Sequence, residues 1–367
     1  MKKILVTGAN GFIGKHMTKA IEKLGYEVLA YDLDKTEKDL INYVNSADFI
    51  VHLAGVNRPL SIVEFYDGNA NFTKKLLDLA IASKRSAPIL MSSSIQAELD
   101  NDYGKSKKMA EDLLFKSGLP VYVFRLANVF GKWCKPNYNS AAATFMHNIA
   151  HDLPIEIRDR NYVVHFNYID DIVNTFILCI KGKISPSDDI LSVKPVHDCS
   201  LGDLADNLYR FKDAVEGEEH LPVLHSEFEA KLFISFLDYL KDEKYFYNFA
   251  EDYRGYFQEI YKNEKYGQIS LNVSHPDILK GGHYHTYKNE IFMTVKGECL
   301  TRLRKIGTKE IESYPQGEKD FTKVNITPGY THDIRNVGQG DSVTIMWISE
   351  VYSEKTPDTF REDVDIK

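Results

Sequence analysis

The stretch Thr7-Gly8-Ala9-Asn10-Gly11-Phe12-Ile13-Gly14 lies between the apolar residues 4–6 and a helical pattern of apolar residues over 17–24. This order predicts a strand, a tight turn and a helix. Glycine at 8 permits the turn, glycine at 11 lets the backbone approach a phosphate, and glycine at 14 lets the helix lie against the strand. Because the free N–H groups and the positive dipole end of the helix would face the turn, the stretch predicts a pyrophosphate site.

A second predicted strand, over residues 27–31, ends at Asp32. Spaced glycines also occur in ordinary strand-turn-helix units, but an acid at this distance from them commonly binds the ribose hydroxyls of NAD. The pattern therefore favours a dinucleotide site and leaves the choice of dinucleotide open. The carboxylate of Asp32 would repel the 2′-phosphate of NADPH and favour NADH, whereas Lys35 could help to accept NADPH.

The length of the chain, 367 residues, exceeds one ordinary domain and suggests two. The formal net charge of −8 argues against nucleic-acid or membrane-surface partners, which need a basic face. Four scattered cysteines without a Cys-x-x-Cys pair predict reduced thiols. Since no stretch approaches the roughly 20 apolar residues that span a bilayer, we expect a soluble, cytoplasmic protein.

Strand and helix patterns alternate through the first part of the chain. Predicted strands cover residues 48–53, 89–91, 121–124 and 163–168, and predicted helices cover 63–83, 103–117, 170–180 and 201–211. Continuous apolar strands separated by helices are typical of an α/β, Rossmann-type, doubly wound parallel sheet.

The pattern changes in the last third of the chain. After a polar, acidic stretch over 212–219 and a predicted helix over 228–240, short alternating runs appear at 269–273, 290–295, 299–303, 323–326 and 343–348. Short strands at regular spacing predict an all-β sandwich or barrel. We therefore expect a nucleotide-binding domain over residues 1–243 and an all-β domain over residues 244–367.

The first chemical motif joins Ser94, at the end of a predicted strand, to Tyr103 and Lys107 on the following helix. A Tyr and a Lys four residues apart stand on one helical face. The ammonium would favour the phenolate and lower the pKa of the tyrosine, which could then exchange a proton with a carbonyl or alcohol. Such pairs are also common on helix surfaces, but the nearby glycine loop and serine-rich strand end favour a catalytic role.

The second motif is His283-x-His285, followed by Glu290 and, in a later hairpin, by His332. Two histidines two residues apart on a strand point to the same face. A single His-x-His pair is often structural, but three imidazoles and a carboxylate suit Zn²⁺, or Fe or Mn on ligand type alone. The four residues therefore predict a metal site.

The glycine loop, the His52-Leu53-Ala54-Gly55 turn and the Ser/Tyr/Lys set resemble the extended short-chain dehydrogenase/reductase family, which acts mostly on nucleotide sugars. The resemblance implies that Ser94, Tyr103 and Lys107 are catalytic and that the cofactor is NADPH or NADH, with NADPH favoured by the family. The implied cofactor site consists of Gly8, Asn10, Gly11, Phe12, Ile13, Gly14, Asp32, Leu53, Ala54, Gly55, Tyr103, Lys107, Arg125 and Asn128.

Cations follow in segments where this family binds the substrate diphosphate. Surface charge that is merely solvated would explain each of them equally well. The residues that we expect to bind the substrate are Arg58, Asn128, Asn139 and Arg160.

The histidine motifs resemble the cupin family, although Asp277 stands where a glycine usually opens the first motif and Gly329 directly follows Pro328 in the second. The resemblance implies a barrel that holds Zn²⁺ through His283, His285, Glu290 and His332. Residues 252–259 also resemble the opening of cupins that epimerise nucleotide-linked 4-keto sugars.

The fusion of these two parts, with the segments Gly55-Val56-Asn57-Arg58-Pro59 and 131–139, resembles the bifunctional CapF-type family over essentially the whole chain. The resemblance implies C3 epimerisation of a UDP-2-acetamido-2,6-dideoxy-hexos-4-ulose by the cupin and NAD(P)H reduction of its C4 ketone by the first domain. The product would be UDP-N-acetyl-6-deoxy-L-talosamine, on the route to UDP-N-acetyl-L-fucosamine for capsule or O-antigen. A homodimer, paired through the cupin, is also implied.

Two alternatives stay open at this point. Sugar-nucleotide 4-epimerases and 4,6-dehydratases use the same fold and triad but recycle a tightly held NAD. Dehydratases usually carry Asp-Glu beside the catalytic serine, whereas Ile95 and Gln96 follow Ser94. The other alternative is a non-catalytic nucleotide-sensing module with a structural cupin, because a fold alone does not establish an activity.

Overall fold

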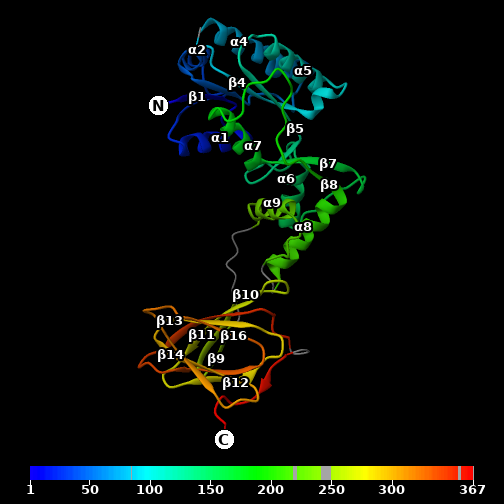
Figure 1. Cartoon of the computed structure of the whole chain (residues 1–367). Coiled ribbons are helices and arrows are strands. Elements are labelled where there is room, and N and C mark those ends of the chain that lie inside the picture. The colour runs from blue at the N-terminus through cyan, green and yellow to red at the C-terminus, as the bar shows by residue number, and fades with distance from the viewer. Residues whose placement is uncertain (84, 218–220, 241–248, 354–356, 367) are drawn as a thin grey trace. The chain divides into compact units, whose positions relative to one another are not determined.

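The chain forms two compact units in the computed structural model (Figure 1), which describes residues 1–83, 85–217, 221–240, 249–353 and 357–366. Unit 1 comprises Met1–Tyr209 and His225–Lys241, and unit 2 comprises Arg210–Leu224 and Asp242–Lys367. The expected domain boundary at 243/244 lies outside the described residues and stays a prediction. Among the described helices, none combines the length and the apolar character that crossing a bilayer requires.

Unit 1 is built on a five-stranded parallel sheet. Its strands are β1 (Lys3–Thr7), β2 (Glu27–Tyr31), β3 (Phe49–His52), β4 (Ile89–Ser94) and β5 (Val121–Leu126), in the spatial order β2-β1-β3-β4-β5. β3 is buried along its whole length and β4 along all but its last residue, as expected for a parallel sheet covered on both faces. The predicted Rossmann-like parallel sheet is confirmed.

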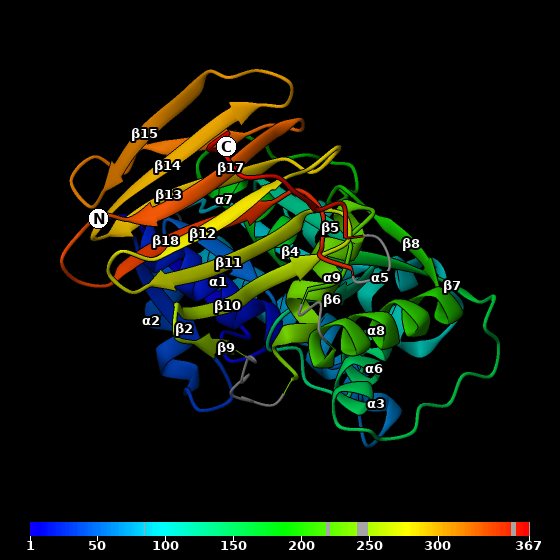
Figure 2. The ribbon, with the colours of Figure 1, turned by 90° about the horizontal axis from the view of Figure 1, so that it is seen from below.

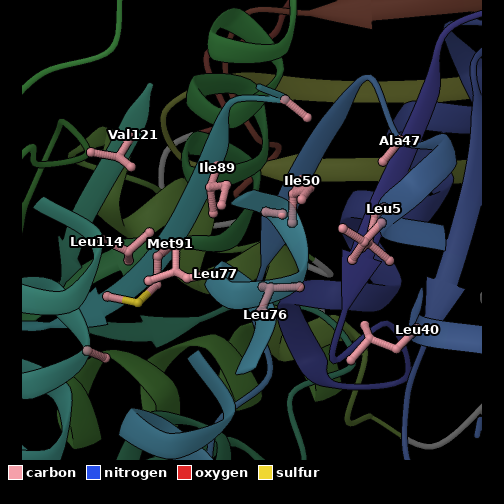
Figure 3. Close-up of a cluster of buried hydrophobic side chains, with 14 of the residues drawn as sticks. Leu5, Leu40, Ala47, Ile50, Leu76, Leu77, Ile89, Met91, Leu114 and Val121 are labelled. Atoms are coloured by element: carbon pink, nitrogen blue, oxygen red, sulfur yellow. The ribbon is translucent and has the colours of Figure 1, made fainter. Parts of the chain in front are cut away.

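Helices cover both faces of this sheet (Figure 1). The helix α1 (Phe12–Lys23) packs on α7 (Ile169–Ile180), and α2 (Glu37–Ser46), α4 (Phe72–Ala82) and α5 (Asp102–Phe115) pack side by side. Figure 3 shows the core between the sheet and this second layer, where strand residues such as Leu5, Ile50 and Ile89 meet helix residues such as Leu76 and Leu114. This apolar burial fixes the strand ends at which the candidate site lies.

The other elements of the first part of the chain are mostly short. They are α3 (Ile62–Phe65), a π-helix (Tyr66–Asn71), a 3-10 helix (Ile95–Glu98), β6 (Asn128–Phe130), α6 (Ala141–Ala150), β7 (Val163–Tyr168), β8 (His197–Ser200), α8 (Leu201–Glu216) and α9 (Glu227–Leu237). The strands β6, β7 and β8 form a small separate sheet. The predicted end of the helix at residue 211 is wrong, because α8 continues into the polar stretch as far as Glu216 and buries Val215.

Unit 2 contains two antiparallel sheets (Figures 1 and 2). One has the order β16-β13-β18-β11-β10-β9 and the other β15-β14-β17-β12-β19. Their bounds are β9 (Phe249–Asp252), β10 (Gly255–Asn263), β11 (Gly267–Ser274), β12 (Leu279–Tyr284), β13 (Glu290–Lys296), β14 (Glu298–Lys305), β15 (Ile311–Gly317), β16 (Lys323–Ile326), β17 (Tyr330–Asn336), β18 (Ser342–Ile348) and β19 (Phe360–Arg361). One apolar cluster takes Phe292 and Met346 from the first sheet and Leu303 and Ile334 from the second, so the sheets share a core. The predicted all-β part is confirmed, but the pairing of the described strands does not close into a single barrel.

Candidate active site and candidate metal centre

The glycine loop connects β1 to α1 in the predicted way. Gly8 has φ +70°, and a Cβ atom there would lie only 2.7 Å from the backbone nitrogen of Ala54. A Cβ atom at Gly14 would lie 2.1 Å from the carbonyl oxygen of Gly8, so α1 can approach the loop only because position 14 lacks a side chain. Gly11 is the N-cap of α1 and offers no side-chain cap, which leaves the helix end open to an anion.

Ser94, Tyr103 and Lys107 come together at the carboxyl end of β4. Ser94 is the last residue of β4, and its hydroxyl shares a hydrogen bond with the phenol of Tyr103. Lys107 is buried and its Nζ donates a hydrogen bond to the carbonyl of Ser92 at 3.1 Å. The same ammonium lies 3.1 Å from the place where a Cβ atom of Gly55 would stand, so the turn after β3 closes over it.

Burial governs the protonation of this set. It raises the pKa of Tyr103, and the hydrogen bond from Ser94 opposes that rise only in part. Burial also lowers the pKa of Lys107 to about 8, against the nearby carboxylate of Glu111. The lowered pKa expected for Tyr103 from its lysine neighbour is therefore wrong, because desolvation of the phenolate outweighs the hydrogen bond with Ser94.

Asn69, in the π-helix, supports the site and was missed by the sequence analysis. Its Nδ2 donates to Ser106 Oγ at 2.9 Å and to the carbonyl of Val56 at 3.0 Å, and its Oδ1 accepts from the Val56 N–H at 3.0 Å. Asn69 thus ties the turn after Gly55 to the helix that carries Lys107. No sequence signal marks it, since its role depends on two segments that are distant in the chain.

Arg125 is paired with two carboxylates. Its Nε and Nη2 bind the two carboxylate oxygens of the fully buried Glu111 at 2.9 and 2.7 Å, and its Nη1 binds Glu98 at 2.6 Å. Ser93 also donates to Glu111, at 2.6 Å. Because three guanidinium nitrogens are already paired, Arg125 stiffens the ends of β4 and β5, and we leave it out of the proposed cofactor site.

The expected substrate residues have different partners. Arg58 lies over the ring of Tyr138 at 5.7 Å, beside the exposed Asn139. In contrast, Arg160 Nη2 binds both carboxylate oxygens of Asp206, at 2.8 and 2.7 Å. The Nδ2 of the exposed Asn128 donates to the carbonyl of His165 at 3.2 Å. Arg58 and Asn139 therefore remain the stronger candidates for a substrate contact.

In unit 2 the predicted metal ligands do converge. One ligand atom from each of His283, His285, Glu290 and His332 lies within 4.8 Å of every other. Glu290 Oε2 is 2.9 Å from His332 Nε2 and 3.4 Å from His285 Nε2, yet both His285 Nε2 and Glu290 Oε2 are buried without a hydrogen-bond partner. Buried polar atoms that face one another without bonding are expected where an ion would satisfy them.

The electrostatics of this cluster also suit a cation. Burial lowers the pKa of His283 to about 4, which keeps its imidazole neutral and able to coordinate. Burial favours the protonated form of Glu290, but the close imidazoles of His285 and His332 outweigh it and hold the pKa of that carboxyl well below its usual range. His285 Nδ1 contacts the carbonyl of Asp358 at 2.5 Å, which orients the other ring nitrogen toward the cluster.

A row of buried polar residues on β11 was also missed. Its members alternate along the strand and are Gln268, Ser270, Asn272 and Ser274. Lys280, on β12, donates from Nζ to Asn272 Oδ1 at 2.7 Å, so the row faces the strand that carries His283. The apolar cluster lies mainly on the other strands, so the β11 row and Lys280 form a buried polar layer in this half of the interior.

These features define a class of protein. The chain belongs to the NAD dependent epimerase/dehydratase family, whose model matches residues 4–190, and a Polysaccharide biosynthesis C-terminal domain model matches residues 250–360. The UDP-2-acetamido-2,6-beta-L-arabino-hexul-4-ose reductase of Pseudomonas aeruginosa is 42% identical over 98% of both chains. The crystal structure of the capsular polysaccharide assembling protein CapF from Staphylococcus aureus has 40% identity and a TM-score of 0.90, over 98% of this chain and all of that one. The CapF-type resemblance is thereby confirmed over the whole chain.

More distant structures agree on the fold alone. The UDP-glucuronic acid 4-epimerase from Bacillus cereus, solved with UDP-glucuronic acid and NAD, is 17% identical with a TM-score of 0.54. It covers 65% of this chain, and this chain covers 98% of it.

Proposed function

We propose that the chain is a bifunctional enzyme of capsular or O-antigen sugar synthesis that acts on a UDP-linked 4-keto amino sugar. Unit 1 reduces the C4 ketone with NAD(P)H, and unit 2 epimerises C3. The observation that carries the proposal is the meeting of Ser94, Tyr103 and Lys107 beside the glycine loop, at the strand ends where this class of sheet binds ligands. The name of the full-length Pseudomonas relative, a hexul-4-ose reductase, supports it.

In unit 1 the side chains of the site donate the proton that the reduction requires. The raised pKa of Tyr103 keeps the phenol protonated near neutral pH, so it can donate its proton to the carbonyl oxygen of the sugar. Ser94 is placed to hydrogen-bond the same oxygen, and the charged Lys107 stabilises the phenolate that remains. When bound, the reduced nicotinamide supplies the hydride for the carbonyl carbon.

In unit 2 we propose a cupin-type site in which His283, His285, Glu290 and His332 hold Zn²⁺. The ligand types suit zinc, and ligands of one zinc ion lie about 2.0–2.2 Å from it, so atoms within 4.8 Å of one another need only small rotations. When bound, the metal supplies a Lewis acid that polarises the ketone and acidifies the neighbouring carbon. We propose that the polar row on β11 and Lys280 bind the sugar nucleotide while the C3 proton leaves and returns on the opposite face.

The two reactions support each other. Epimerisation beside a ketone is reversible, because the same acidic proton can leave either isomer. Reduction removes the ketone and with it the acidity of that proton. The reductase step therefore draws the preceding equilibrium toward the reduced, C3-inverted product.

A single incubation tests the proposal. The protein is mixed with a UDP-2-acetamido-2,6-dideoxy-hexos-4-ulose in deuterated water with NADH or NADPH, and the 340 nm absorbance and the product NMR spectrum are followed. We expect one reduced nicotinamide consumed per product, with deuterium at C3. Sugar turnover without loss of absorbance would instead support a 4-epimerase or dehydratase, and nucleotide binding without turnover would support the sensing module.

The metal is tested by elemental analysis after passage over a chelating resin. We expect about one zinc per chain in the native protein, with C3 deuterium exchange lost when the zinc is stripped and restored when it returns. Full exchange in metal-free protein would reduce the four ligands to a structural role. The homodimer implied by the resemblance stays a prediction that light scattering can check.

A further inference from the structure

The C-terminal segment, residues 357–366 (red in Figure 1), contains none of the predicted site residues, yet it lies against the candidate metal centre. Its short strand β19 pairs with β12, the strand that carries His283. Further along the segment, the carbonyl of Glu362 accepts a hydrogen bond from the hydroxyl of Thr331, the residue before His332. The C-terminal segment therefore contacts both strands that carry the histidine motifs.

Within this segment, the carboxylate of Asp358 binds the turn over residues 286–289, which joins the two ligands His285 and Glu290. Its two oxygens accept hydrogen bonds from three successive backbone N–H groups of the turn and from one hydroxyl. The donors are the N–H groups of Thr286, Tyr287 and Lys288, at 3.0, 3.1 and 3.2 Å, and Thr286 Oγ1, at 2.5 Å. Successive N–H groups that converge on one anion hold the turn in a single shape.

The main chain of Asp358 acts on a ligand directly. Its carbonyl oxygen lies 2.5 Å from His285 Nδ1. Because a carbonyl only accepts, Nδ1 must carry the hydrogen, and Nε2 keeps the lone pair that a metal ion requires. That Nε2 lies 3.4 Å from Glu290 Oε2. One residue thus sets the tautomer of His285 and the shape of the turn that leads to Glu290.

The place of Asp358 is fixed by contacts on both sides of it. The residue is 7% exposed and has φ +42°, a conformation that asparagine and aspartate adopt more readily than most residues other than glycine. On one side, Lys288 Nζ donates to the carbonyl of Pro357 at 2.7 Å. On the other side, Arg304 Nη2 donates to the carbonyl of Asp363 at 2.8 Å. A displaced Asp358 would break these contacts as well as its own.

We propose that Asp358 is a positioning residue of the metal centre, and that the C-terminal segment must be docked for His285 and Glu290 to hold a metal ion. The inference rests on the metal site proposed for unit 2 and adds a requirement outside the four ligands. Because the coupling between two binding events is reciprocal, binding of the ion should in turn stabilise the docked segment. Both directions of this coupling can be measured.

The first experiment measures the zinc affinity of the full chain by competition with a coloured chelator. Asp358→Asn keeps the size of the side chain and replaces one acceptor oxygen by a donor, whereas Asp358→Gly removes the carboxylate and keeps the carbonyl and the positive φ. We expect zinc affinity to fall about 10–100-fold in both variants, as is typical when a residue that orients a metal ligand is lost. Native affinity in either variant, with a native circular dichroism spectrum, would overturn the inference.

Glu362→Gln is the matched control. Glu362 belongs to the same segment, but its carboxylate pairs with Arg304 at 2.8 Å and not with the turn between the ligands. We expect native zinc affinity in this variant, and an equal loss would overturn the particular role of Asp358. The visible absorption of the Co²⁺-loaded protein gives a second readout, because it depends on ligand geometry. It should change in Asp358→Gly and not in Glu362→Gln, and an unchanged spectrum in Asp358→Gly would contradict the positioning role.

The second experiment uses the native protein, so it does not depend on the folding of a variant. Hydrogen exchange is compared with and without zinc. We expect the amides of residues 286–290 and 358–362 to exchange about 10–100-fold more slowly with zinc, while those of β15 do not change. Protection confined to 286–290 would overturn the inference. A native protein that binds no zinc would overturn the proposed metal site itself, whereas bound zinc that is indifferent to Asp358 would overturn only the inference.

Discussion

Tyr103 is the residue whose loss should separate the two proposed activities. Tyr103→Phe keeps the ring that packs 5.7 Å from Phe65 but removes the proton donor. We expect NAD(P)H oxidation to fall by roughly 10²–10⁴-fold, while deuterium exchange at C3 continues, because that exchange depends on unit 2. The 340 nm assay and NMR of the same sample provide the measurement. Native reductase rates in the variant would remove Tyr103 from the mechanism.

Burial of the charged Lys107 side chain should lower the free energy of unfolding at neutral pH. Its pKa falls from 10.5 to about 8 on burial, which corresponds to about 3 kcal/mol at 1.36 kcal/mol per pKa unit. Below pH 8 the lysine is charged in both states, so the whole cost is present. Between pH 8 and 10.5 only the unfolded chain binds the proton, so stability rises with pH.

Lys107→Met tests this cost by urea unfolding at several pH values. We expect the variant to be more stable than the native protein by up to about 3 kcal/mol at pH 7, with the difference disappearing toward pH 10.5. Lys108→Met is the matched control, since Lys108 is exposed and pairs with Asp112 at 2.9 Å. A destabilised Lys107→Met at pH 7 would show that the hydrogen bond to Ser92 outweighs the desolvation of the charge.

The π-helix at Tyr66–Asn71 matters because it holds Asn69 between the Gly55 turn and α5. Asn69→Ala removes three hydrogen bonds, and we expect a stability loss of about 2–3 kcal/mol. Because the turn and the catalytic helix are then free to shift, kcat/KM should fall at least about tenfold. Asn71→Ala, which removes only an exposed contact to Asp67, should leave both quantities unchanged. Equal effects in the two variants would contradict the proposed role of Asn69.

The sequence predicts an element best where a local pattern decides it. The strand over 163–168 and the strand over 323–326 have the predicted bounds. The end of α8 was misplaced because a polar composition concealed the apolar spacing that continues to Val215. Asp277 stands where the first cupin motif usually has a glycine. It keeps the backbone conformation that favours glycine, with φ +66°.

Site residues were likewise predictable where a local motif marks them. The glycine spacing, the Tyr-x-x-x-Lys pair and the histidine motif are local. The structure joins the glycines in one turn, brings Tyr103 to Ser94 and Lys107 to Ser92 on β4, and gathers the histidines. Partners that come from distant segments of the chain could not be predicted in this way. The pairing of Arg125 with Glu111 and the Asn69 contacts depend on the packing of the sheet and helices, so no sequence pattern marks them. The pKa of Tyr103 likewise depends on burial, which the motif does not encode.

At the level of the whole chain, the proposal predicts that the two activities are separable and then restorable by mixing. His332→Ala should lose the metal and C3 exchange but keep a native nicotinamide site, and Tyr103→Phe should do the reverse. Neither variant alone should form the reduced, C3-inverted product.

An equimolar mixture of the two variants should form that product, because the epimerised ketone that leaves one protein can be reduced by the other. The readout is product NMR together with the loss of 340 nm absorbance, with each variant alone at the same total concentration as the control. A mixture that stays inactive would show that the ketone never leaves the protein between the steps. Product formed by His332→Ala alone at the native rate would show that unit 2 takes no part in the chemistry.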